Sequence, residues 1–241
     1  MYRYYRKIIP LLIVVSFLLG CATSYDARGK YHRAQRGETV YTIADGYGIS
    51  AQELAEFNNL QDPKDLPSGR KLYIPERKSK HPQYKRLPWD LVDKDRRGYK
   101  RSFKKGTKSE QEQVKYERGI FVWPVKGKLL SKFGMRNGVP HEGIDIKGEI
   151  GTPIKAAADG KVVYSSKMTG YGNIIILKHK NEYFTAYAHN KVNLAKKGKS
   201  VKQGDKIAEV GKTGRTTGPH LHFEIRHKQR PRNPLFFLPE R

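Results

Sequence analysis

Cysteine is almost absent from this chain of 241 residues. The single one, Cys21, excludes an intramolecular disulfide and leaves too few ligands for a zinc site of the cysteine-rich structural type. Acidic residues are also scarce, because 23 Asp and Glu stand against 48 Lys and Arg, for a formal net charge of +25. Such an excess predicts binding to an anionic surface, with nucleic acid, anionic lipid and the carboxylates of a cell wall as the candidates.

A long hydrophobic run is missing as well. The apolar stretch at residues 8–20 has 13 uncharged residues and follows the basic segment 2–7. A helix needs roughly 20 apolar residues to span a membrane. The stretch therefore predicts a secretory signal peptide over residues 1–20 rather than a membrane-spanning helix.

The predicted signal peptide leads into the tetrapeptide LLGC at residues 18–21. This ending resembles the bacterial lipobox, whose cysteine is acylated and becomes the first residue of the mature chain. The resemblance implies a lipid anchor on Cys21 and a short tether over residues 21–29. Because Ala22 rather than an acidic residue follows, it also implies the periplasmic face of the outer membrane in a Gram-negative envelope. An ordinary signal peptide with an incidental cysteine, or an uncleaved anchor, is the alternative.

Residues 30–76 predict a small module with the order strand, helix, helix, strand. Thr39 can cap a first helix over residues 40–48, and Ser50 with Glu53 forms the capping-box pattern of a second helix. The runs RGETVYTIADGYGIS, LAEFNNL and LPSGRKLYIP resemble the LysM domain, which binds glycans that contain N-acetylglucosamine. The resemblance implies peptidoglycan binding, and a small α+β domain without a glycan role is the alternative. Because a single module binds weakly, we expect a locator whose removal leaves cleavage of a soluble substrate intact.

The next segment, residues 77–118, carries 15 basic and six acidic residues with few aliphatic ones. It cannot bury enough apolar area to fold alone, which predicts a linker. Two interpretations stay open. The linker adheres to wall carboxylates or acidic lipid headgroups, or it is a solvated tether.

Residues 119–241 are rich in glycine and β-branched residues and show no pattern of a long helix. Strands are predicted at residues 160–164, 172–177 and 183–187. The fold class predicted for the chain is therefore a mainly β domain preceded by a small α+β module of βααβ order.

Residues 220–225 (HLHFEI) alternate apolar and polar side chains, as a strand with one face in a core would. The alternation places His220, His222 and Glu224 on the face opposite the core. Two neighbouring imidazoles suit a metal or an acid–base pair, although two surface histidines need no function. Glu224 could orient a histidine, but we expect an exposed glutamate in a salt bridge.

A second group of polar residues lies at residues 141–146 (HEGIDI). Gly143 allows a bend through which His141 and Asp145 converge. One histidine, one aspartate and a distant histidine make a set of ligands suited to zinc, and three protein ligands leave a fourth position for water.

The residues around the other histidines indicate less about their roles. His189 follows a predicted strand with the parity of Tyr187, so we expect it to face a cleft. The remaining four are expected to be structural or surface residues: His32, His81, His179 and His227.

Five runs carry a strong family resemblance: FVWPVKGKLLSKFGMRNGVPHEGIDI, GTPIKAAADGKVVYSS, GYGNIIILKH, YAHN and VKQGDKIAEVGKTGRTTGPHLHFEI. They span residues 119–235 and look like the LytM/lysostaphin-type zinc metallopeptidases. The resemblance implies a β-sheet groove with Zn²⁺ at its floor, held by His141, Asp145 and His222. His220 and His189 would be the two non-ligand histidines that handle the proton and the developing oxyanion.

The combination implies a zinc metalloendopeptidase that cleaves peptide crosslinks of peptidoglycan in wall remodelling or division. Residues 30–76 would bind the glycan and residues 119–241 the peptide stems. The layout also resembles lipoproteins that activate cell-wall amidases, many of which have lost zinc ligands. All five positions are filled here, which favours an enzyme, with an activator that binds an amidase as the alternative. The secretory signal and the lack of aromatic stacking motifs argue against nucleic acid.

The bond that such an enzyme would cut stays open between two crosslinks. In a wall without glycine bridges the target would be D-Ala–diaminopimelate, and in a wall with them it would be Gly-Gly.

Overall fold

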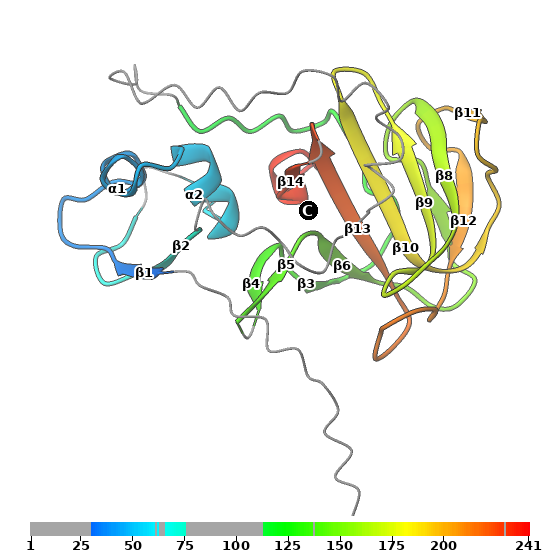
Figure 1. The fold of residues 1–241 in the computed structure, drawn as a ribbon, viewed down its shortest axis with the longest axis horizontal. Helices are drawn as coiled ribbons and strands as arrows, with labels where there is room; N and C mark the ends of the chain where they lie inside the picture. The colour runs from blue at the N-terminus through cyan, green and yellow to red at the C-terminus, as the bar shows by residue number, and fades with distance from the viewer. Residues whose placement is uncertain (1–29, 61, 63–65, 76–112, 137, 229) are drawn as a thin grey trace, which may run out of the picture.

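The computed structural model describes residues 30–60, 62, 66–75, 113–136, 138–228 and 230–241 (Figure 1). The predicted signal peptide, Cys21, the tether, most of the linker and His81 lie outside these residues. Within the described residues, no helix has the length and apolar character needed to cross a membrane.

The N-terminal module, residues 30–75, consists of β1 (Lys30–Arg33), α1 (Val40–Tyr47), α2 (Ala51–Phe57) and β2 (Lys71–Ile74). Strands β1 and β2 pair antiparallel. The predicted order of strand, helix, helix and strand is confirmed.

The ends of both helices follow from their cap residues. The Thr39 side chain accepts a hydrogen bond from the Thr42 amide, and α1 ends at Gly48, which has a left-handed backbone at φ 64°. The Ser50 side chain accepts a hydrogen bond from the Glu53 amide at 3.1 Å and so begins α2. Each cap satisfies a backbone group that the helix itself leaves without a partner.

The β-rich domain, residues 119–241, is confirmed as mainly β, and η1 is the one helical element in its described residues. Its elements are β3 (Leu129–Ser131), β4 (Gly134–Arg136), β5 (Val139–His141), β6 (Ile144–Lys147), β7 (Pro153–Lys155), β8 (Gly160–Met168), β9 (Gly172–Lys178), β10 (Tyr183–Asn193), β11 (Ser200–Val201), β12 (Lys206–Val210), β13 (His220–His227), β14 (Arg230–Arg232) and the 3₁₀ turn η1 (Pro234–Phe236).

One large antiparallel sheet organises the β-rich domain in the order β11-β8-β9-β10-β13-β6-β3. Strand β13 is therefore central, with β10 on one side and β6 on the other. Its register places His222 opposite Asp145 on β6 and opposite Ala188 on β10. Because directly paired residues point to the same face of a sheet, His222 and Asp145 lie side by side.

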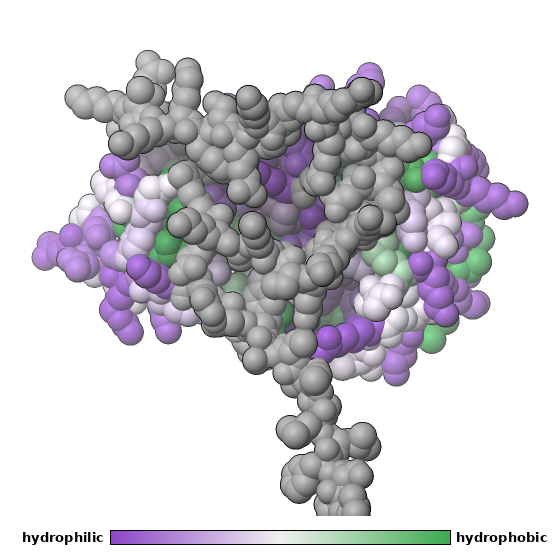
Figure 2. All heavy atoms as spheres, viewed as in Figure 1, coloured by the Kyte–Doolittle hydropathy of each residue, from purple (hydrophilic) through white to green (hydrophobic). Residues whose placement is uncertain are grey.

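The two faces of the sheet are both buried near β13. One face packs Leu221, Phe223 and Ile225 into the main core, as the alternation predicts. The other face carries a smaller apolar cluster that includes Ala186 and Ala188 on β10. Hydrophilic side chains cover much of the described surface at both ends of the molecule (Figure 2), in keeping with the charge of +25.

Candidate metal centre

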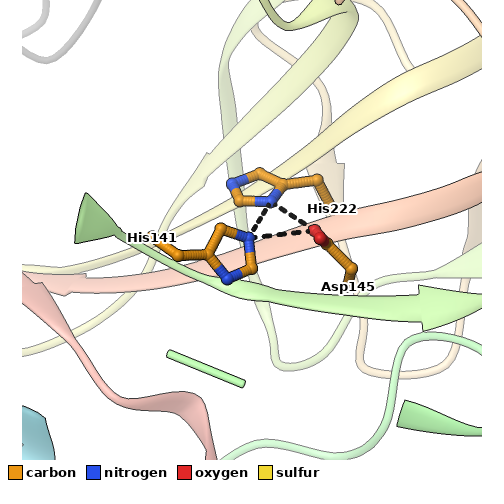
Figure 3. Close-up of side chains that lie close together, drawn as sticks. All are labelled: His141, Asp145 and His222. Atoms are coloured by element: carbon orange, nitrogen blue, oxygen red, sulfur yellow. Dashed lines mark hydrogen bonds and ion pairs between the residues drawn. The ribbon is translucent and has the colours of Figure 1, made fainter. Parts of the chain in front are cut away.

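Three sequence-predicted side chains meet where β5, β6 and β13 come together (Figure 3). His141 Nε2 lies 3.1 Å and His222 Nδ1 lies 2.8 Å from Asp145 Oδ1. The two nitrogens lie 3.2 Å from each other. One ligand atom from each residue therefore converges on a single point.

The remaining ring nitrogens fix the protonation of both histidines. His141 Nδ1 lies 2.8 Å from the Lys132 carbonyl oxygen, and His222 Nε2 lies 3.1 Å from Glu224 Oε1. A carbonyl or carboxylate oxygen only accepts, so each ring donates its N–H there. His141 Nε2 and His222 Nδ1 thus face one another with lone pairs, which repel unless a proton or a metal cation lies between them. The donor set fits a bound cation.

The electrostatics of the same three residues agree with this fit. Burial acts to raise the pKa of Asp145, but its close contacts with the His141 and His222 rings outweigh burial and hold that pKa far below its ordinary value. Burial acts to lower the pKa of His222, but its bonds to Asp145 and Glu224 raise it to about 9. Without a metal, the site therefore keeps a proton on His222 at neutral pH, in the place a cation would take.

Gly143 is required here by a close approach between strands. A Cβ atom at this position would collide with the Phe223 carbonyl oxygen and lie 2.9 Å from His222 Cε1. Any larger residue would push the HEGIDI segment away from β13, and His141 and Asp145 with it.

Glu224 is fully buried, so the expected exposed salt-bridging role is wrong. Strand β13 is central, and Tyr171 and Arg226 cover this part of its outer face. The Tyr171 hydroxyl donates to Glu224 Oε1 at 2.8 Å, and Arg226 Nε donates to Oε2 at 2.7 Å. Arg226 also pairs with Glu142. Burial acts to raise the pKa of Glu224, but the charge of Arg226 and the bond from His222 lower it, so an ionised carboxylate stands behind His222.

Two further imidazoles reach the same place, as the sequence predicts. His220 Nδ1 lies 2.9 Å from the Gly218 carbonyl oxygen, and His189 Nδ1 lies 2.7 Å from that of Thr213. Both rings therefore carry the proton on Nδ1 and present a bare Nε2. His220 Nε2 is 3.6 Å from Asp145 Oδ1. The ring centres of His189 and His220 are 4.9 Å apart. Burial lowers the pKa of His189 to about 4.

His189 does face the groove, but not for the reason expected from the sequence, which was that it shares the parity of Tyr187. Tyr187, whose parity it shares, is buried in the main core. The pairing of β10 with β9 shifts register between Tyr187 and Asn190, and His189 has φ 63°, which is uncommon outside glycine. This irregularity turns the His189 ring out of the core and toward His220.

A groove of about 1020 Å³ contains all five residues. Its wall also includes Arg136, whose Nη1 lies 3.2 Å from Asp145 Oδ2, and Arg215. No pattern in the sequence had pointed to Arg136 or Tyr171. Glu224 and Arg226 are two residues apart on one strand and so share a face, and this spacing could have predicted their buried ion pair. Three other histidines interact elsewhere in the fold: His32 and His179 form side-chain hydrogen bonds, and His227 stacks on Tyr183.

This fold, with two histidines and an aspartate at the centre of an antiparallel sheet, defines a class of metallopeptidase domain. Residues 139–234 match peptidase family M23, and residues 32–75 match the LysM domain. The chain belongs to peptidase family M23 and carries a LysM domain, which confirms both resemblances seen in the sequence.

The relatives of the chain include proteins that are named lipoproteins. It is 34% identical over 244 residues to the "Uncharacterized lipoprotein YgeR" of Escherichia coli K12, covering 96% of this chain and 92% of YgeR. It is 49% identical over 120 residues to the "Murein hydrolase activator NlpD" of the same strain, covering 49% of this chain and 31% of NlpD. The match with NlpD thus spans about a third of that protein.

Similar solved structures include two peptidases. A "zinc containing peptidase" from Vibrio cholerae is 40% identical and covers 49% of this chain and 40% of that chain, with a TM-score of 0.47. The catalytic domain of lysostaphin from Staphylococcus simulans is 33% identical and covers 46% of this chain and 90% of that domain, with a TM-score of 0.41.

Proposed function

We propose that the protein is a zinc-dependent endopeptidase that cleaves peptide crosslinks in peptidoglycan. One observation carries the proposal: His141 Nε2, His222 Nδ1 and a carboxylate oxygen of Asp145 converge in a groove. Two nitrogens and one oxygen suit Zn²⁺, and three protein ligands are the number that catalytic zinc sites use.

The neighbouring histidines supply the proton chemistry. When bound, zinc lowers the pKa of a water molecule to about 7 and polarises a carbonyl group. His220 Nε2 is bare and can accept the proton of the attacking water, because its Nδ1–H is held by the Gly218 carbonyl. The same nitrogen can then return that proton to the leaving amine, as a general acid.

His189 acts in the same groove, but its protonation restricts when it acts. Its Nδ1–H is held by the Thr213 carbonyl, and its lowered pKa keeps the ring neutral at neutral pH. The bare Nε2 must therefore first receive a proton before it can donate to the developing oxyanion. We assign His189 to oxyanion stabilisation after that transfer.

The test of this function is direct. The purified full chain should contain about one zinc per molecule, because a single site with three protein ligands holds one ion. It should also release crosslinked peptides from isolated wall sacculi. A chelator should stop the release, and added zinc should restore it. A zinc-loaded chain that releases nothing from sacculi would contradict the proposal.

The proposed place of this activity is the periplasmic face of the outer membrane. Residues 30–76 would bind the glycan, residues 119–241 the peptide stems, and a lipid on Cys21 the membrane. The LLGC sequence and the naming of YgeR as a lipoprotein support the anchor. Cys21→Ser is expected to remove the lipid and move the protein out of the outer-membrane fraction. Unchanged fractionation of Cys21→Ser would rule out this anchor.

The 49% identity over 120 residues to NlpD, a named murein hydrolase activator, supports a second function. In that case the groove would serve to bind a cell-wall amidase, and the protein would not need to cut peptides itself. Both functions can reside in one chain.

A further inference from the structure

The N-terminal module buries a charge against the β-rich domain. Glu56, on helix α2, is only 3% exposed. Its carboxylate accepts hydrogen bonds from Arg232 Nε at 2.9 Å and Nη2 at 2.6 Å, and from the Asn233 backbone amide at 3.0 Å. A glutamate is almost never buried this completely without a charged partner. The contact is therefore a specific interface between the module and the β-rich domain.

A chain of amides extends the same interface toward β4. Asn233 Nδ2 donates to the Glu56 carbonyl oxygen and to Asn59 Oδ1, both at 2.9 Å. Asn59 Nδ2 in turn donates to the Phe133 carbonyl oxygen at 2.7 Å. Buried polar groups that all find partners fix one arrangement, because each alternative leaves some of them unsatisfied.

Apolar packing and a glycine complete the fit. The rings of Phe57 and Phe133 meet edge to face with centres 5.3 Å apart. A Cβ atom on Gly134 would collide with the Phe57 carbonyl oxygen. Helix α2 and β4 therefore lie as close as their backbones allow, with α2 the element of the module nearest the β-rich domain (Figure 1).

The end of the predicted linker joins the two parts as well. The Gln52 side chain bonds the Lys115 backbone amide at 2.7 Å, and the Tyr116 hydroxyl donates to the Leu60 carbonyl oxygen at 2.6 Å. The Tyr116 ring also stacks on Phe236 at 4.6 Å between centres. Tyr116 thus contacts both the module and the β-rich domain, and Lys115 contacts the module.

The interface lies next to the support of a candidate metal ligand. Asn59 bonds the carbonyl of Phe133, and the preceding carbonyl, that of Lys132, holds His141 Nδ1 at 2.8 Å. Arg232, which Glu56 holds, pairs with Ile225 on β13, the strand that carries His222. The module therefore contacts the segment that supports His141 directly, through Asn59 just after helix α2, and contacts the strand of His222 through Arg232.

We infer that the N-terminal module is a docked part of the metal centre rather than a separate locator. Helix α2 fixes the segment Lys132–Gly134, and that segment orients His141 for the metal. The coupling to zinc rests on the proposed function, whereas the docking does not. Deleting residues 30–76 would uncover Arg232 and Phe133, so the expectation that deletion leaves cleavage intact is replaced by its opposite.

Point variants of the full chain in detergent test the inference. Asn59→Ala removes the bond to the Phe133 carbonyl, and Glu56→Gln removes the charge that faces Arg232. Asp45→Asn, at an exposed position of helix α1 in the same module, is the matched control. Zinc affinity is measured by competition with a chromophoric chelator. Loss of a hydrogen bond made directly to a metal ligand typically weakens metal binding about 10- to 100-fold. Asn59 acts one residue away from such a bond, so we expect the lower end of that range, about tenfold, for Asn59→Ala and no change for the control.

Calorimetry of the metal-free chain provides the second readout. Wild type and Asp45→Asn should unfold in one transition that includes the module, and Glu56→Gln should split it into two. Wild-type zinc affinity in both interface variants, or two transitions in the wild type, would overturn the inference. A wild type that holds no zinc would instead overturn the proposed function, and the unfolding of the metal-free chain would still decide the docking.

Discussion

His222→Ala is expected to lose both zinc and peptide cleavage, whereas His220→Ala keeps its zinc and loses most turnover. His222 supplies one of three converging ligand atoms, and the remaining pair should hold the metal poorly. His220 offers only its bare Nε2 to the attacking water. General acid–base help is worth roughly 10²- to 10⁴-fold, so kcat should fall by that factor in His220→Ala. Metal analysis and digestion of a crosslinked muropeptide measure the two effects separately.

The control for both variants is His227→Gln, a change at the other end of the same strand. His227 stacks on Tyr183 with ring centres 4.7 Å apart and belongs to neither the groove nor the metal cluster. It should keep zinc and turnover. An activator predicts another pattern: no cleavage by the wild type, and amidase stimulation that His220→Ala leaves unchanged. That pattern in a zinc-loaded wild type would exclude the endopeptidase.

Glu224→Ala is expected to lower the free energy of unfolding of the metal-free chain by about 3–5 kcal/mol, the usual cost of removing one partner from a buried ion pair. Glu224 is fully buried between Arg226, Tyr171 and His222. Because Arg226 keeps its contact with Glu142, the lower end of that range is expected. Denaturant unfolding followed by circular dichroism provides the measurement.

Glu182→Gln serves as the matched control for that loss. Glu182 is exposed and pairs with Lys228 at 3.4 Å across the end of the sheet. Exposed pairs contribute about 0–1 kcal/mol, so this variant should unfold near the wild-type midpoint. Equal losses in Glu182→Gln and Glu224→Ala would show that the buried network does not stabilise the fold.

Local patterns in the sequence were enough to predict much of the fold and the candidate metal residues. The alternation in residues 220–225 placed three apolar side chains in the core and His222 on the other face, as the structure has them. Thr39 and Ser50 marked both helix starts because a cap depends only on the next three residues. The spacing in residues 141–146 held one histidine and one aspartate within reach of each other.

The failures came from contacts that no local pattern records. The orientation of His189 depends on a register shift against β9, which alternation along β10 alone cannot show. The burial of Glu224 depends on β13 being a central strand, covered from the side by Tyr171. The bond from Glu56 to Arg232 joins residues far apart in the sequence.

Ionic strength divides the charges of this protein into two classes. Exposed lysines and arginines that face an anionic wall are screened over about 8 Å at physiological salt, and over shorter distances in stronger salt. The pair of Glu56 and Arg232 is largely withdrawn from solvent, and buried pairs are screened much less. If these exposed charges hold the protein to the wall, concentrated salt should release it while helix α2 stays docked, so that a high-salt wash yields a molecule whose two parts are still joined.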